Sequence, residues 1–140
     1  MRTVRDPEGG RYVLLKESEE SSLVRDPETG ERFHLSSDDL EPVDGTSPLV
    51  TAARGVPSPV RRVLSAVPEE RALGLLFEID AQGPVGVRSL LDGTDLCESD
   101  LHGLLAEFRA AELVEETRVG GNRGYETTAL AERALEYLRE

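Results

Sequence analysis

The residues best suited to chemistry lie in a short glycine-rich segment, residues 118–124. Arg118, Asn122 and Arg123 stand there among three glycines, a composition that predicts a tight hairpin tip over residues 120–124. Guanidinium groups bind phosphates, and a narrow tip can approach a nucleic-acid groove closely. The segment therefore predicts a hairpin that contacts an anionic partner. The alternative is that these arginines only balance the glutamates beside them.

A second group of candidates lies on a helix predicted over residues 98–111. Its apolar residues recur at helical spacing and define a buried stripe: Leu101, Leu104, Leu105 and Phe108. The opposite face carries only small side chains: Ser99, Gly103, Ala106 and Ala110. His102 and Arg109 line one edge of this face, and Asp100 and Glu107 line the other. A DNA groove or a partner helix could approach such a face closely, although a plain solvated face is the alternative.

Few residues support other chemistry. Cys97 is the single cysteine, which excludes an intramolecular disulfide and a cysteine-rich zinc site. Its position before a helix could favour redox sensing, but a small buried apolar residue is the alternative. His34 and His102 lie in different segments, and the sequence contains no nucleophile motif, phosphate loop or spaced acid/base pair. We therefore expect no enzyme activity, no metal and no cofactor.

The elements that must position the candidates occupy roughly the C-terminal half. Helices are predicted over residues 68–80, 87–93 and 98–111, a strand over 113–119, a return strand over 125–127, and a last helix from Thr128. Gly83 and Pro84 end the first helix, and Asp92 and Gly93 end the second. Three helices, a two-stranded hairpin and a closing helix are typical of a winged helix-turn-helix domain.

This stretch resembles the ArsR-type and MarR-type transcriptional regulators. The resemblance rests on Leu-Leu at 104–105 followed by Leu-Val at 113–114, on the glycine-rich wing with Arg123, and on Tyr-Glu-Thr-Thr at 125–128. The whole chain also resembles small winged-helix proteins of haloarchaea. The resemblance implies a transcriptional regulator that binds double-stranded DNA through its third helix and its wing. The implied DNA-contacting residues are Ser99, His102, Gly103, Ala106, Arg109, Arg118, Asn122 and Arg123. The alternative function is a winged-helix module that binds another protein and no DNA.

The N-terminal segment contains an internal repeat. Asp-Pro-Glu-x-Gly occurs at residues 6–10 and again at 26–30, and both copies have the composition of turns. Strand-like runs flank them at residues 3–5, 11–15, 22–26 and 31–35, which predicts a four-stranded antiparallel meander. Its thin apolar face is expected to cover the C-terminal domain with Tyr12, Leu14, Leu23, Phe33 and Leu35. The fold class is thus α+β, with a β-hairpin module at 1–45, linking helices at 46–67 and the winged helix at 68–140.

The linking segment carries its own signals. Residues 38–45 are predicted as an acidic connector. Ser47 and Pro48 then predict the start of a short helix over 49–54. A further helix is expected to bury Val60, Val63, Leu64 and Val67, with Arg61 and Arg62 outside the stripe.

The last helix has an apolar arc wider than packing on one core requires. The arc contains Leu130, Ala131, Ala134, Leu135, Tyr137 and Leu138. Its width predicts a homodimer through this helix, and coverage by the N-terminal sheet is the alternative.

The net charge of the chain bears on whether it can bind DNA. The net charge is −12, and only Lys16 of the 16 basic residues is a lysine. This composition resembles that of haloarchaeal proteins. In molar salt the Debye length is about 3 Å, so an acidic surface repels DNA little. The alternative is an acidic protein of ordinary cytoplasm that binds another protein. Because no apolar run reaches signal-peptide or membrane-span length, we expect a soluble cytoplasmic protein.

Overall fold

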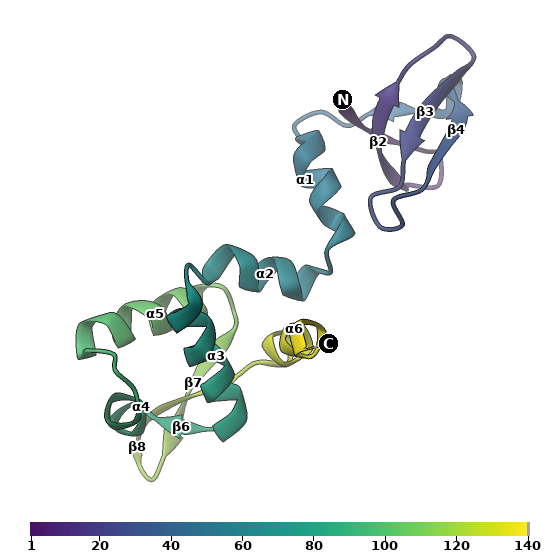
Figure 1. The fold of residues 1–140 in the computed structure, drawn as a ribbon. Coiled ribbons are helices and arrows are strands. Elements are labelled where there is room, and N and C mark those ends of the chain that lie inside the picture. The colour runs from purple at the N-terminus through teal and green to yellow at the C-terminus, as the bar shows by residue number, and fades with distance from the viewer. Residues whose placement is uncertain (140) are drawn as a thin grey trace. The chain divides into compact units, whose positions relative to one another are not determined.

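The computed structural model describes residues 1–139, which divide into two compact units, residues 1–57 and residues 58–139. The first is a β-sheet with a short helix, and the second is mostly helical, so the fold class is α+β (Figure 1). The segment expected to link two domains is divided between the units. Its first helix belongs to the sheet unit and its second to the helical unit.

The sheet of the first unit is antiparallel with the strand order β4-β3-β2-β1-β5. Its strands are β1 (Arg2–Arg5), β2 (Arg11–Lys16), β3 (Ser21–Arg25), β4 (Arg32–Ser36) and β5 (Glu41–Pro42). The predicted four-stranded meander is present. The prediction of a plain acidic connector is wrong, because that segment contains the 3₁₀ helix η1 (Ser37–Asp39) and β5. This segment follows β4 at one edge of the sheet, and its strand β5 forms the other edge, where it pairs with β1.

Both copies of the internal repeat form turns that their aspartate stabilises, and the second turn is one residue longer than the first. Asp6 Oδ1 accepts a hydrogen bond from Glu8 N (3.0 Å), and Asp26 Oδ1 accepts one from Glu28 N (2.9 Å). Gly9 and Gly30 follow with φ of +90° and +76°, which glycine adopts without steric cost. Partial burial and a hydrogen bond donated to Asp6 raise the pKa of the Tyr12 hydroxyl.

The first unit buries residues on both faces of its sheet. On one face Val4, Leu14 and Val24 are buried, and Leu40 of the connector packs on them. Adjacent residues of a strand face opposite ways, so Val24, and not the expected Leu23, joins this cluster. On the other face, the hydroxyl oxygen of Thr3 lies 2.6 Å from that of Thr51 in α1 (Pro48–Ala52). Ser47 caps α1 as predicted, and η2 (Ala53–Gly55) follows it.

The second unit places helices around a small antiparallel sheet with the order β6-β8-β7. Its elements are α2 (Ser58–Ala66), α3 (Glu70–Gln82), β6 (Val85–Gly86), α4 (Val87–Gly93), α5 (Glu98–Ala110), β7 (Val114–Val119), β8 (Asn122–Thr127) and α6 (Ala129–Arg139). The core gathers residues from every one of these helices, with Phe108, Leu76, Ile79 and Leu101 fully buried. The predicted stripe of α5 is therefore directed inward. Leu64 of α2 is 65% exposed, so its predicted place in a buried stripe is wrong.

The last helix is held by its own unit. Ala131, Ala134 and Leu135 belong to the core and are 0% exposed. At the far end of α6, the Arg139 guanidinium lies 3.4 Å from Asp80 Oδ2 and 4.8 Å from the centre of the Phe77 ring, both on α3. Leu135 is thus not available to a second copy of the chain. Tyr137 and Leu138 are the large apolar side chains of α6 that stay exposed.

Candidate nucleic-acid interface

The glycine-rich hairpin turns over only two residues, Gly120 and Gly121, with φ of +59° and +83°. Such a two-residue turn matches the twist of the flanking strands. The prediction of a tip over residues 120–124 is therefore too long. Asn122 and Arg123 belong to β8, where they pair with Val119 and Arg118. Arg118 Nη1 donates a hydrogen bond to the carbonyl oxygen of Gly121 (2.9 Å), which secures the turn.

The hairpin presents different groups on its two faces. Alternation along the paired strands places Glu116, Arg118 and Arg123 on one face, whereas Glu115 and Asn122 lie on the other. Toward its base, the first face enters the core through Val114 and Tyr125. Arg123 and Asn122, which the sequence grouped as one tip, therefore point in different directions.

The outward face of α5 is as small as the sequence predicts. Ser99, Gly103, Ala106 and Ala110 are all exposed. At the edge of this face, His102 Nε2 lies 3.7 Å from Glu98 Oε1. Cys97 precedes the helix as its N-cap, and its Sγ accepts a hydrogen bond from Asp100 N (3.4 Å). Because Cys97 is exposed, the alternative of a buried apolar cysteine is wrong.

Glu116 connects α5 with the hairpin. Its Oε1 lies 2.8 Å from Arg123 Nε, and its Oε2 lies 3.8 Å from Arg109 Nη2. Both arginine side chains are more than half exposed, at 59% and 58%. Arg109 of α5 and Arg123 of β8 therefore both face the Glu116 carboxylate. Sequence reasoning named both arginines, and it named Glu116 only in the alternative that the hairpin arginines balance neighbouring glutamates. For Arg123 that pairing is present.

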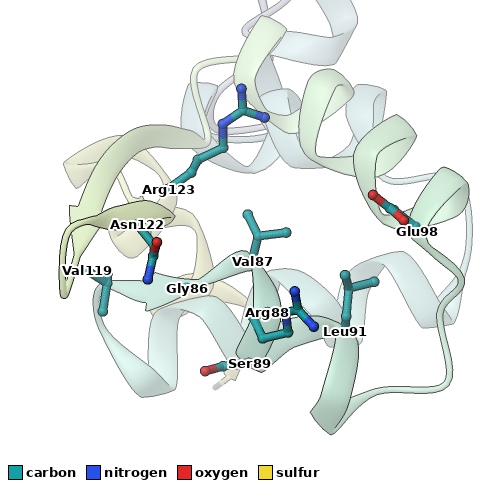
Figure 2. Close-up of a pocket in the computed structure, with 9 residues that line it drawn as sticks. All are labelled: Gly86, Val87, Arg88, Ser89, Leu91, Glu98, Val119, Asn122 and Arg123. Atoms are coloured by element: carbon teal, nitrogen blue, oxygen red, sulfur yellow. The ribbon is translucent and has the colours of Figure 1, made fainter.

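A polar cleft of about 540 Å³ opens beside the hairpin (Figure 2). It is lined by Gly86, Val87, Arg88, Ser89, Leu91, Glu98, Val119, Asn122 and Arg123. Arg88, from the first turn of α4, is exposed, and no carboxylate of the described residues forms an ion pair with it. The sequence prediction omitted Arg88. The sequence pattern predicted no strand at β6 and so offered no signal that placed Arg88 beside the hairpin.

Comparison with known proteins places the chain in a family. The chain belongs to DUF7346, a family of unknown function. The family model matches residues 1–139 and thus includes both units. The sheet unit is therefore part of the family's common architecture, together with the helical unit. No curated protein and no solved structure matches the chain.

The opposite side of α5 is acidic in this DUF7346 member. A groove of about 420 Å³ runs between α5 and the start of α3. Glu69, Asp100 and Glu107 line it, and they are accompanied by a single arginine, Arg71. Arg71 Nε lies 3.7 Å from Asp95 Oδ2. Cationic groups thus lie toward the hairpin and α4, and carboxylates lie toward α3.

Other kinds of site find little support in the described residues. Within residues 1–139, no three His, Cys, Asp or Glu side chains are placed to hold a metal ion. No helix in that range is long and apolar enough to cross a membrane.

The ion pairs of the described chain leave most carboxylates without a cation. Five carboxylates lie within 4.0 Å of an arginine guanidinium and a sixth, Glu98, lies that close to His102, against 28 acidic residues in the sequence. Unscreened repulsion among them should loosen the fold in dilute buffer. We expect the melting temperature, measured by circular dichroism, to be higher in 3 M than in 0.1 M potassium chloride. Each 1 kcal/mol regained corresponds to about 4–8 °C in a unit of this size. Equal melting temperatures would contradict the halophilic interpretation.

Proposed function

We propose that the helical unit is a winged helix-turn-helix that binds double-stranded DNA, as in a transcriptional regulator. In this proposal α4 and α5 form the helix-turn-helix, and β7 with β8 forms the wing. One observation carries the proposal: a single cleft gathers Arg88 of α4, Arg123 of β8 and Glu98 of α5, the helix whose small residues are exposed. The resemblance to ArsR-type and MarR-type regulators supports the same function.

The geometry suggests that α5 contacts base edges and that the arginines beside it contact phosphates. A helix with a face of small side chains can enter a major groove deeply, where Ser99 and His102 are the groups able to reach base edges. Arg88 and Arg123 lie beside that helix and are suited to phosphate oxygens, which fix the position of a protein on DNA. Arg118 contributes less, because it is engaged with the turn carbonyl.

A titration of the DNA upstream of the coding region tests the proposal. In molar salt the counterion-release term is nearly exhausted, so affinity must come from fitted contacts. We expect Arg123→Ala to weaken binding by about 1–3 kcal/mol, the range for one good contact. Fluorescence anisotropy of labelled DNA in 1 M potassium chloride measures the affinity.

Two control variants are titrated beside Arg123→Ala. Arg133→Ala removes an exposed arginine of α6 and should leave the affinity unchanged. Glu107→Ala removes a carboxylate from the acidic groove and should leave it unchanged or slightly higher. If the wild type binds no upstream DNA, the proposal fails. If Arg123→Ala binds as well as the wild type, the wing has been assigned the wrong role.

The acidic groove favours a second candidate function, a module that binds another protein. Three carboxylates beside the small-residue face of α5 complement a basic helix better than a phosphate backbone. A wild type that ignores DNA but loses binding to a basic peptide when Glu107 is replaced would support this alternative.

We propose in addition that the protein is a homodimer through α6. The support is a local excess of exposed apolar side chains: Leu64 is 65% exposed, Tyr137 is 51% exposed and Leu138 is 40% exposed. Leu64 and Leu138 line one groove of about 300 Å³ between α2 and α6. A second copy related by two-fold symmetry would cover the same groove on both partners.

A further inference from the structure

We propose that Arg109 and Arg123 form a single phosphodiester site, and that Glu116 occupies this site while the protein is free of DNA. The inference rests on the proposed DNA binding and adds a named anion site with an internal competitor. It starts from one geometric fact: the two oxygens of Glu116 face guanidinium groups from α5 and from β8.

The three side chains are arranged as an anion bound by two cations. A phosphodiester carries one negative charge and two free oxygens, and so does a carboxylate. Arg123 contacts one oxygen at 2.8 Å and Arg109 approaches the other at 3.8 Å. Two guanidinium groups that flank one carboxylate repel each other less when an anion lies between them. Glu116 supplies that anion, and a DNA phosphate could replace it.

The exposure of the group makes the exchange feasible. The arginine side chains are 58% and 59% exposed, and the Glu116 side chain is 36% exposed, so a ligand can reach all three. Pairs of this exposure contribute little to stability, and their loss should not unfold the protein. The 2.8 Å contact with Arg123 is shorter than the Debye length of about 3 Å at 1 M salt, so this pair should persist in the salt regime of the DNA assay. The 3.8 Å approach of Arg109 is longer than that length and is screened more strongly.

The chain offers a matched control for Glu116. Glu115 is the preceding residue of β7, is also exposed, and lies on the opposite face of the hairpin. No cation of the described residues forms an ion pair with it. Glu115→Gln and Glu116→Gln therefore change the net charge equally. Only Glu116→Gln removes a negative charge from the site between the arginines.

The first measurement is made without DNA. In ¹⁵N NMR spectra of the full chain in 1 M potassium chloride, Glu116→Gln should move the Nε–Hε resonances of Arg109 and Arg123. Glu115→Gln should leave them in place. Equal effects of the two variants would show that Glu116 does not fill the site, and this would overturn the inference whatever happens with DNA.

The second measurement is the DNA titration. We expect Glu116→Gln to bind roughly two- to fivefold more tightly than Glu115→Gln, the gain expected from weak exposed pairs. We also expect a steeper dependence on salt, by about 1 in the slope of log affinity against log salt for one more available cation. The double variant of Arg109→Ala and Arg123→Ala should lose less than the sum of the single losses, because both residues serve one phosphate.

The outcomes separate the inference from the proposed function. Weaker or equal binding by Glu116→Gln, with wild-type DNA binding present, would overturn the internal competitor and leave DNA binding standing. Additive losses in the arginine variants would overturn the single site. A wild type that binds no DNA would overturn the proposed function and the phosphate site together, although the NMR comparison would still report the pairing of Glu116.

Discussion

Replacing Leu135 with glutamate is expected to unfold the helical unit. Leu135 is 0% exposed and belongs to the cluster that includes Val63, Leu76 and Phe108. Burying a carboxylate without a partner costs several kcal/mol, which is comparable with the whole stability of a small domain. Circular dichroism at 222 nm in 3 M potassium chloride should show loss of helix and of a cooperative melt.

Leu138→Glu provides the matched control on the same helix. Leu138 is 40% exposed, so the new carboxylate can remain hydrated and the fold should persist. If copies of the chain pair through α6, light scattering should find a dimeric wild type and a folded, monomeric Leu138→Glu variant. A folded Leu135→Glu variant would contradict the burial of that residue, and a monomeric wild type would remove the proposed dimer.

The contrast between Leu135 and Leu138 shows what helical periodicity can predict. The sequence pattern predicted the last helix and the residues that could be buried. It did not predict which side of the wide apolar arc packs on the core of the helical unit. The decision depends on α2 and α3, which lie far away in the sequence and supply the covering side chains. Leu64 illustrates the same limit, since its spacing fits a buried stripe and yet its side chain is 65% exposed.

Local signals predicted more where the backbone itself sets the structure. The Asp-Pro-Glu-x-Gly repeats, the Ser47 cap and the stop at Gly83 all depend on neighbouring residues, and all are present. The strand β5 was missed because only two residues pair, with a strand 35 or more positions earlier in the sequence. Its pattern is too short for any period to be recognised.

The candidate site depended on one turn. Three glycines allowed several hairpin tips, and only the turn over Gly120 and Gly121 pairs Arg118 with Arg123. That register brings Glu116 diagonally next to Arg123, so a correct turn assignment would have revealed this ion pair from the sequence. The approach of Arg109 follows from the packing of α5 on β7, which no local pattern encodes.

Gly124→Ala is expected to destabilise the helical unit by about 1–3 kcal/mol, the usual cost of overpacking. A Cβ at Gly124 would lie 2.6 Å from the carbonyl oxygen of Val85 and 2.8 Å from Val119 Cγ2. The first of these atoms is backbone, so β6 must move away from β8 where Gly86 pairs with Gly124. Thermal melts should show a melting temperature lower by about 4–8 °C per kcal/mol. An unchanged value would contradict the close approach of β6 and β8.

Gly103→Ala is the matched control, and it carries a test of function. Nothing lies within 4 Å of a Cβ at Gly103, and the position is inside α5, so alanine should stabilise the helix by up to about 1 kcal/mol. The same methyl group stands on the exposed small-residue face. If DNA approaches that face closely, Gly103→Ala should melt at a higher temperature and yet bind DNA less tightly. A variant that gains stability and keeps its full affinity would show that α5 does not enter the groove, and would leave DNA contact to Arg88 and the wing.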